Sequence, residues 1–215
     1  MTNPAKPTAA PQAYVVLDVE TTGIFPETDM ITYLQAVKIS NGKVIDRYCA
    51  LVNPGMEISM ETERLTGITN EMVADKPNIA EVLPAFLAFW GTATGVAFRV
   101  AFDVAFLRKC AQTLGLDIPN NALDIHDLAK EMLPGLTSYT SRAVAKELRV
   151  KRVHRGQVLG GADIVAKVFC KLHEMKKKAT YAGGRRNESI QRSHGDGSAG
   201  MHEAARIVRG SRRTL

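Results

Sequence analysis

The stretch AYVVLDVETTG, residues 13–23, decides the fold of this 215-residue chain. Its first residues are apolar and partly β-branched, as is typical of a buried strand. Asp18 and Glu20 lie two residues apart, so both carboxylates point to the same face of that strand. Two such acids repel each other unless a cation holds them, and hard oxygen ligands suit Mg²⁺ or Mn²⁺. The stretch therefore predicts a central strand that carries candidate metal ligands.

The sequence on either side of this strand is typical of a mixed α/β domain. Two strand-like runs, ITYLQAVKI and KVIDRYCALV, are joined by Asn41-Gly42, which is a strong hairpin signal. We therefore expect the first three strands to be antiparallel neighbours. The run TGVAFRV predicts one more buried strand. Helical spacing predicts helices near residues 79–91, 101–116, 122–134, 140–150 and 159–177.

The net charge of +6 is unevenly distributed. Residues 175–215 contain ten Lys and Arg against three acids, which leaves the rest of the chain near neutral. We expect a flexible Pro/Ala-rich leader over residues 1–12, a folded domain over residues 13–178 and a basic Gly/Ser/Arg-rich tail over residues 179–215. The tail either binds an anionic partner or is a solvated extension, and its end could form a short docking helix.

Several classes of protein are disfavoured by composition. No apolar run approaches the roughly 20 residues of a membrane span, and the leader lacks the apolar stretch of a signal peptide. The three cysteines, Cys49, Cys110 and Cys170, are far apart and odd in number, which favours reduced thiols over a disulfide framework. We therefore expect a cytoplasmic protein with no membrane partner.

A third acid, Asp103, stands among apolar residues at the start of the helix near residues 101–116. It either caps that helix or complements Asp18 and Glu20 as a further metal ligand.

Six segments together resemble the DnaQ-like DEDDh 3′–5′ exonucleases, the family of the proofreading epsilon subunit of bacterial DNA polymerase III. The resemblance runs from about Tyr14 to Leu172. In order, the segments are VVLDVETTG, LVNP, LTGITNEMV, EVLPAFLAFWG, AFDVAFLRK and ALDIHDLAKEMLPG.

The resemblance implies a ribonuclease H-like fold, with a mixed sheet flanked by helices, and the removal of nucleotides from 3′ ends. It also implies two Mg²⁺ or Mn²⁺ ions held by four carboxylates, and a histidine that activates water. Asp18, Glu20 and Asp103 match the first three carboxylate positions. As nucleic-acid contacts we expect Thr21, Thr22, Gly23, Arg99 and Phe102. The tight turn at residues 21–23 lets backbone groups approach a ligand, and the Arg99 cation could contact phosphate directly.

The family's last motif, H-R-A-L-x-D-A-x-x-T-A-x-x-F, aligns without gaps to GQVLGGADIVAKVF. The histidine position falls on Gly156 and the aspartate position on Gly161. A bulge could return His154 to the catalytic position. Asp163 is the other candidate ligand, but it shares an i, i+4, i+8 stripe with Lys167 and Lys171 that predicts exposure.

Other departures also fall at polar positions. Phe98 and Arg99 replace a polar pair, Thr66 stands where the family often has histidine, and Tyr33 stands where it often has glutamate.

Three functions remain open. The first is a domain that binds nucleic acid 3′ ends or a replication or repair partner, with weak or lost nuclease activity and one metal ion or none. The second is an active exonuclease that recruits Asp124 or Asp127, although both also suit helix caps or surface charges. The third is a scaffold that docks a polymerase or other protein through residues 179–215.

Overall fold

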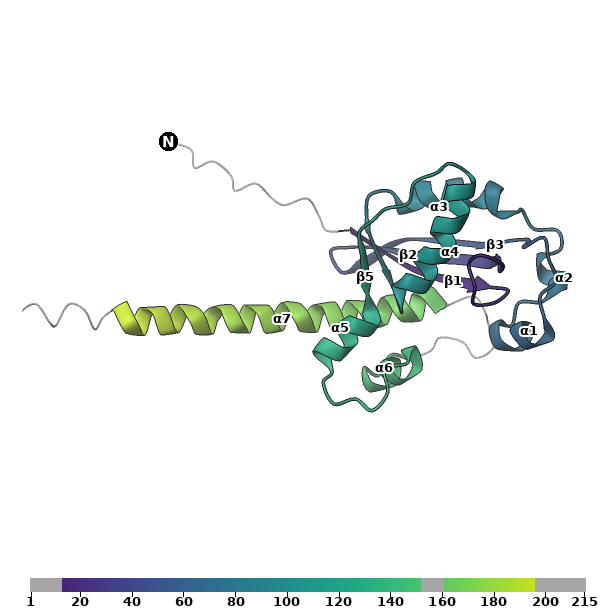
Figure 1. Ribbon diagram of the computed structural model, residues 1–215. Helices are drawn as coiled ribbons and strands as arrows, with labels where there is room; N and C mark the ends of the chain where they lie inside the picture. The colour runs from purple at the N-terminus through teal and green to yellow at the C-terminus, as the bar shows by residue number, and fades with distance from the viewer. Residues whose placement is uncertain (1–12, 152–160, 196–215) are drawn as a thin grey trace, which may run out of the picture. The chain divides into compact units, whose positions relative to one another are not determined.

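A five-stranded mixed sheet forms the centre of the computed structural model, which describes residues 13–151 and 161–195 (Figure 1). The strand order is β3-β2-β1-β4-β5. β2 pairs antiparallel with both β1 and β3, whereas β4 pairs parallel with β1 and with β5. The predicted mixed sheet and its three antiparallel N-terminal strands are confirmed. The strands are β1 (Ala13–Thr21), β2 (Ile31–Ser40), β3 (Lys43–Leu51), β4 (Thr94–Ala97) and β5 (Ala122–Asp124).

The hairpin between β2 and β3 turns at the predicted Asn41-Gly42. Both residues have positive φ, 51° and 74°, which is the backbone that a type I′ turn requires. The turn pairs Ser40 directly with Lys43, and it thereby starts the register of the two strands.

Each of the five helices that the sequence predicts has a counterpart among the described residues, and two further short helices, Met60–Thr66 and Asn70–Val73, precede them. The predicted helix from residue 122 begins at Ile125, because residues 122–124 form the short strand β5. A three-residue strand is too short to show a periodic pattern. The helices are α1 (Met60–Thr66), α2 (Asn70–Val73), α3 (Ile79–Trp90), α4 (Val100–Thr113), α5 (Ile125–Met132), α6 (Ser141–Glu147) and α7 (Gly161–Gly195).

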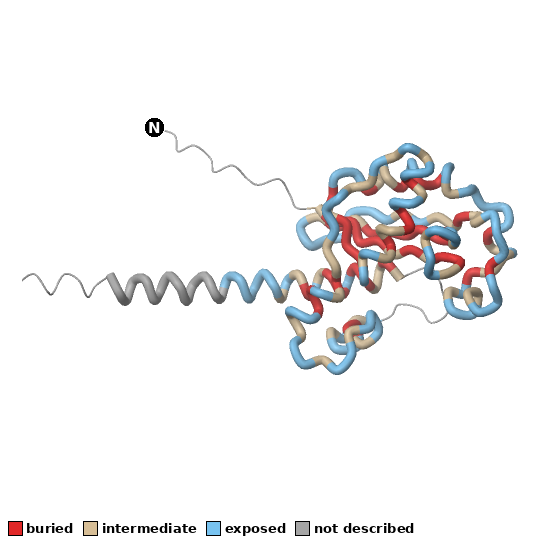
Figure 2. The backbone as a smooth tube through the Cα atoms, viewed as in Figure 1, coloured by how far each residue is buried: buried red, intermediate tan, exposed pale blue. Residues whose placement is uncertain are grey.

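The two faces of β1 pack against different helices. Val15, Leu17 and Val19 lie in one buried cluster with Phe86 of α3 and Phe106 of α4. On the opposite face, the ring of Tyr14 meets that of Phe169 of α7 edge to face, with centroids 4.8 Å apart. Figure 2 shows that β1 and its neighbour β2 are mostly buried. Because side chains alternate along a strand, Asp18 and Glu20 share the α7 face with Tyr14.

The buried and exposed sides of helix α7 follow the helical pattern of its sequence. Val165, Val168, Phe169 and Leu172 are all buried, as the helical pattern predicts, whereas Lys167 and Lys171 are exposed. The ammonium of Lys171 donates to the Leu148 carbonyl at 2.6 Å, so it anchors the end of α6 rather than pairing with Asp163.

The chain divides into two compact units, residues 1–172 and 173–215, and α7 crosses that division. The helix continues to Gly195, so it extends past residue 178 into the Gly/Ser/Arg-rich tail, where the composition does not predict a helix. Composition was misleading because Gly183 and Gly184 cost a helix only about 1 kcal/mol each, while Lys, Arg, Ala and Glu around them favour helix. Across the described residues, no helix has the length and apolar character needed to cross a membrane.

Candidate functional site

Two carboxylates stand at the end of β1, on the same face as predicted. In the β1–β2 register, Asp18 lies opposite Gln35, and Glu20 lies opposite Tyr33. Burial raises the pKa of the Asp18 carboxyl to about 6, although a hydrogen bond from Gln35 opposes the shift. Burial, together with the charge of Asp18, raises the pKa of Glu20 to about 7. Both carboxyls therefore keep a proton up to a higher pH than an ordinary Asp or Glu side chain.

Asp103 joins this pair from the first turn of α4. Its side chain is only 5% exposed, and its Oδ1 accepts the backbone N–H of Val19, between the two acids, at 3.0 Å. Burial raises its pKa well above the usual range, and the charges of Asp18 and Glu20 add to that shift. Arg99, not Asp103, occupies the N-cap position of α4. The structure thus brings the three predicted carboxylates within electrostatic range of one another.

The first residue of α7 faces Asp18 with backbone instead of a carboxylate. A Cβ added to Gly161 would overlap the Asp18 carboxylate and would lie 2.8 Å from the Gln35 Nε2. The Gln35 amide nitrogen in turn donates to the Asp18 Oδ2 at 2.8 Å. Gly161 therefore lies on the inner face of α7, where the alignment to the family's last motif predicts an aspartate.

Asp163 is directed elsewhere. Its Oδ1 accepts from the Arg47 Nε of β3 at 3.1 Å, and the two side chains are 38% and 61% exposed. A helix turns by about 200° over two residues, which carries Asp163 away from the Gly161 face. Asp163 therefore forms a surface ion pair with Arg47, and its assignment as a metal ligand stays a prediction that this contact does not support. His154 and Gly156 lie outside the described residues.

The turn after β1 uses its threonines to hold its own backbone. The Thr22 hydroxyl accepts the Met30 N–H at 3.0 Å and donates to the Asp29 carboxylate at 3.3 Å. A Cβ at Gly23 would overlap Asp29, so this glycine permits the close approach. The same turn leaves Ile24 and Phe25 69% and 61% exposed. The turn that follows β1 therefore presents apolar side chains to solvent.

Arg99 is exposed and has a φ of 62°, a left-handed conformation that is uncommon for arginine. The Asp124 carboxylate stabilises this backbone, since it accepts the N–H groups of Arg99 and Val100 at 3.0 and 3.1 Å. Asp124 also accepts the His126 N–H at 2.8 Å as the N-cap of α5. Asp124 is thus a helix cap, and Asp127, 77% exposed beside His126, is a surface charge.

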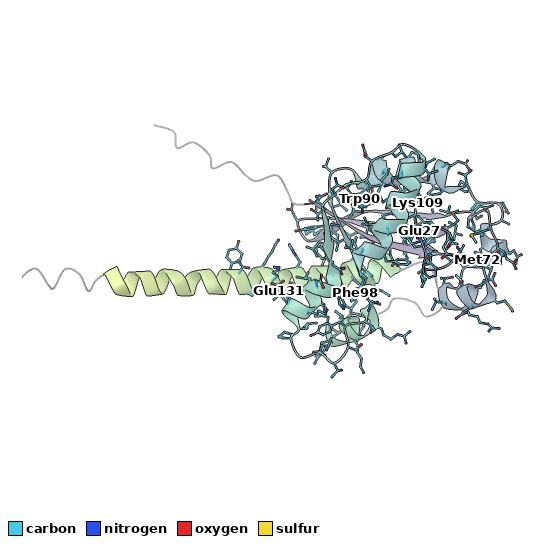
Figure 3. The ribbon with its side chains drawn as sticks, in the orientation of Figure 1. Glu27, Met72, Trp90, Phe98, Lys109 and Glu131 are labelled. Carbon is cyan, nitrogen blue, oxygen red and sulfur yellow. The ribbon has the colours of Figure 1, made fainter. Side chains whose placement is uncertain are left out.

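The aromatic residues near α4 differ in their surroundings. Phe102 packs against the main core, with its ring 5.0 Å from that of Phe106, so much of its surface is committed to the interior. The ring centroid of Phe98, which is labelled in Figure 3, lies 6.3 Å from that of His126. His126 is in turn 6.2 Å from Tyr139. Phe98 therefore belongs to an aromatic row that links the β4–α4 connection to α5 and to the α5–α6 connection.

Two of the replaced polar positions have structural roles. Tyr33 is 2% exposed and belongs to a small core with Ile58, Ile68 and Val73. The Thr66 hydroxyl donates to the Thr62 carbonyl and accepts the Ile68 N–H, so it closes the end of α1. The sequence reasoning missed Gln35, although a polar residue in an otherwise apolar strand was a visible signal.

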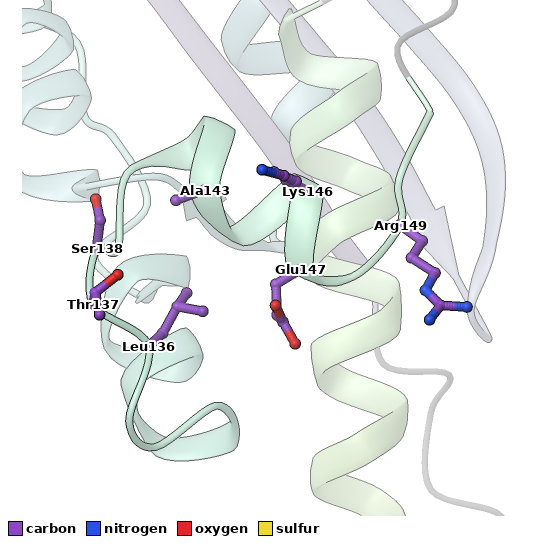
Figure 4. Close-up of a pocket in the computed structure, with 7 residues that line it drawn as sticks. All are labelled: Leu136, Thr137, Ser138, Ala143, Lys146, Glu147 and Arg149. Atoms are coloured by element: carbon purple, nitrogen blue, oxygen red, sulfur yellow. The ribbon is translucent and has the colours of Figure 1, made fainter.

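A separate pocket of about 440 Å³ lies beside α6 (Figure 4). Its walls come from the α5–α6 connection, α6 and the residues just after it. None of the three clustered carboxylates lines it. The lining residues are Leu136, Thr137, Ser138, Ala143, Lys146, Glu147 and Arg149.

The oxygen donors at the end of β1 have the chemistry of a divalent-cation site, but their arrangement does not fit two cations. The Gln35 amide is hydrogen-bonded to an Asp18 oxygen, and α7 contributes Gly161 where a further carboxylate is needed. Within the part of the chain that the structure describes, no group of three His, Cys, Asp or Glu side chains is placed to hold a metal ion.

The chain is similar in sequence to bacterial replication proteins. The RNase_T family model, described as "Exonuclease", matches residues 15–157. A DNA polymerase III PolC-type protein of Thermotoga maritima is 40% identical over 166 residues, 77% of this chain and 12% of the relative. The chain thus spans about an eighth of the PolC-type relatives. The DNA polymerase III epsilon subunit of Aquifex aeolicus is 35% identical over 164 residues, 75% of this chain and 80% of the relative.

Solved structures with low sequence identity share the fold. Exonuclease X in complex with 5′-overhanging duplex DNA superposes with a TM-score of 0.60 at 23% identity, over 75% of this chain and 91% of that one. An exonuclease I from Methylocaldum szegediense gives a TM-score of 0.66 at 18% identity, over 76% and 40% of the two chains. Together with the family match and the order of the sheet, these similarities show that the chain belongs to the DnaQ-like exonuclease family and has its ribonuclease H-like fold.

Proposed function

We propose that this domain binds the 3′ end of a nucleic-acid strand at the end of β1, and that its hydrolytic activity is weak or lost. The observation that carries the proposal is the contact of Gly161 with Asp18, because α7 supplies backbone where the family's two-metal chemistry needs an oxygen ligand. Two divalent ions normally stabilise the attacking and leaving oxygens. Loss of an ion removes several kcal/mol of that stabilisation.

Binding without cleavage is supported by two exposed side chains on the segments next to the acids in sequence, one after β1 and one at the start of α4. Arg99 is an exposed cation at the start of α4, and charged hydrogen bonds from Arg to phosphate are strong. Exposed Phe25 offers a ring on which a base can stack, an interaction that tolerates any sequence. Solved relatives with this fold include an exonuclease bound to duplex DNA.

A protein partner is the second part of the proposal. The similar proteins named above are polypeptides of DNA polymerase III, and the second unit of this chain contains the basic segment. We propose that residues 179–215 contact a polymerase or another replication protein. A pull-down with these residues alone and with the body alone tests this docking, which fails if the body retains the partner or the tail does not.

An active 3′–5′ exonuclease is the alternative function. It is favoured by one observation, that Asp18, Glu20 and Asp103 remain grouped. In this alternative His154 activates water, and Mg²⁺ or Mn²⁺ binds to an incomplete ligand set.

Nuclease activity is tested by incubating the full chain with a 3′-overhang oligonucleotide and Mn²⁺ or Mg²⁺. The control is a variant that carries both Asp18→Ala and Glu20→Ala. We expect no shortening above that control. Metal-dependent shortening that disappears in the variant would establish the alternative.

Strand binding is tested by measuring affinity for a single strand at two salt concentrations. Arg99→Asn should weaken binding and reduce its salt dependence by up to about one phosphate contact. Arg108→Asn, which removes an exposed cation farther along α4, is the matched control. No binding, or equal effects of the two variants, would refute the proposed role of Arg99.

A further inference from the structure

Gln35 and Gly161 divide one space beside Asp18. Gln35 is 4% exposed on strand β2, and its amide nitrogen lies 2.8 Å from the Asp18 Oδ2. The position where Gly161 would have a Cβ is also 2.8 Å from that nitrogen. A larger residue at position 161 would overlap the Asp18 carboxylate first, and it would also crowd the Gln35 amide that is hydrogen-bonded to that carboxylate.

We propose that the Gln35 amide takes the place of a metal ion beside Asp18. A hydrogen bond holds this uncharged amide against the Asp18 carboxylate, and the glycine of α7 leaves room for it. The amide hydrogen bond uses a lone pair of the Asp18 Oδ2 that would otherwise be available to a cation. Gln35 is therefore a positioning residue for Asp18, and it closes this oxygen to metal. The inference rests on the proposed loss of nuclease activity, and it assigns that loss to two positions instead of one.

The distance between Gln35 and Asp18 gives a sharp expectation for Gln35→Glu. This isosteric change places a carboxylate oxygen near the present amide nitrogen, 2.8 Å from the Asp18 Oδ2. Neighbouring oxygens of an octahedral Mg²⁺ site are roughly 2.9 Å apart, given metal–oxygen distances of about 2.0–2.1 Å. One substitution should therefore replace the amide–carboxylate contact with two neighbouring oxygens that can bind the same cation.

The reverse expectation holds for Gly161→Asp. Restoring a carboxylate on α7 while Gln35 remains adds atoms to space that is already filled. We expect this variant to bind Mn²⁺ no better than the unmodified chain. Adding Gln35→Ala should release Asp18 from its hydrogen bond, so that the carboxylate can move away from the new side chain and both acids can share a cation.

The experiment measures Mn²⁺ affinity by titration calorimetry on the full chain, and the shift of thermal unfolding with Mn²⁺ as a second measure. Gln35→Glu should bind at least about tenfold more tightly than the unmodified chain, because affinity rises with the number of charged ligands. Gln112→Glu, an exposed position on α4, is the control of equal charge. The double variant should exceed Gly161→Asp by a similar factor.

The inference is overturned if Gln35→Glu gains no affinity over Gln112→Glu, or if the unmodified chain already binds Mn²⁺ as tightly. It is also overturned if Gly161→Asp alone equals the double variant. If Gly161→Asp does not fold, the comparison of the two glutamate variants decides. Oligonucleotide shortening by the unmodified chain would refute the proposed function, whereas the Mn²⁺ affinities bear on Gln35 itself, so the two failures are distinguishable.

Discussion

Replacing Glu20 with glutamine should stabilise the protein at high pH in the absence of divalent cations. The isosteric amide removes a charge that burial and Asp18 both disfavour. Glu20 gains protons on folding, because its pKa is about 7 in the folded chain against an ordinary value of 4.5. The stability of the unmodified protein should therefore fall as the pH rises from about 4.5 to about 7.

The size of the effect follows from that difference in pKa. Each unit corresponds to about 1.4 kcal/mol, so the upper bound for Glu20 above pH 7 is about 3 kcal/mol. The side chain is partly exposed, and water screens part of the penalty. We expect Glu20→Gln to gain about 1–3 kcal/mol at pH 9, which is about 2–10 °C in unfolding temperature for a chain of this size. Below pH 4.5 the gain should vanish.

Thermal unfolding followed by circular dichroism at pH 4.5 and pH 9, with EDTA present, measures both quantities. Glu27→Gln provides the control, because it removes the same charge from an exposed position in the β1–β2 turn and should change stability by less than about 0.5 kcal/mol. An equal shift at both pH values, or a loss of stability at pH 9, would show that Glu20 is well compensated in the fold, and it would refute the electrostatic reasoning.

Three further changes test neighbouring parts of the structure by chemical denaturation. Asp124→Ala should cost about 2 kcal/mol, because it removes the cap of α5 and the acceptor for the α4 amides; a cost confined to a few tenths would argue against this double role. Asp163→Ala should cost less than about 1 kcal/mol, since its pair with Arg47 is exposed, and any change in Mn²⁺ affinity would show that Asp163 serves the carboxylate cluster after all. Gly161→Ala should cost about 1–3 kcal/mol through overlap with Asp18, and a neutral or stabilising result would mean that α7 does not approach so closely.

The central strand and its acids could be predicted because the signal is local. Alternation places Asp18 and Glu20 on one face, and Asn41-Gly42 specifies the hairpin from two residues. The helix pattern of α7 likewise predicts that position 161 faces inward and position 163 outward, and the structure has this arrangement.

The partner of Asp18 could not be predicted in the same way. Gln35 meets Asp18 only through the β1–β2 register, and a nine-residue connection separates those strands, with an irregularity at its start. A short hairpin turn sets the register of its strands, whereas a longer connection leaves it to tertiary packing. The strand β5 and the long extension of α7 were missed for related reasons, because neither has a strong local pattern.

The most direct test of the missing ligand is a crystal of the unmodified protein soaked in Mn²⁺, with an anomalous difference map. We expect no pair of Mn²⁺ ions at Asp18 and no protein ligand from α7. Two ordered ions about 3.5–4 Å apart, bridged by Asp18 and joined by a carboxylate of α7, would contradict the account.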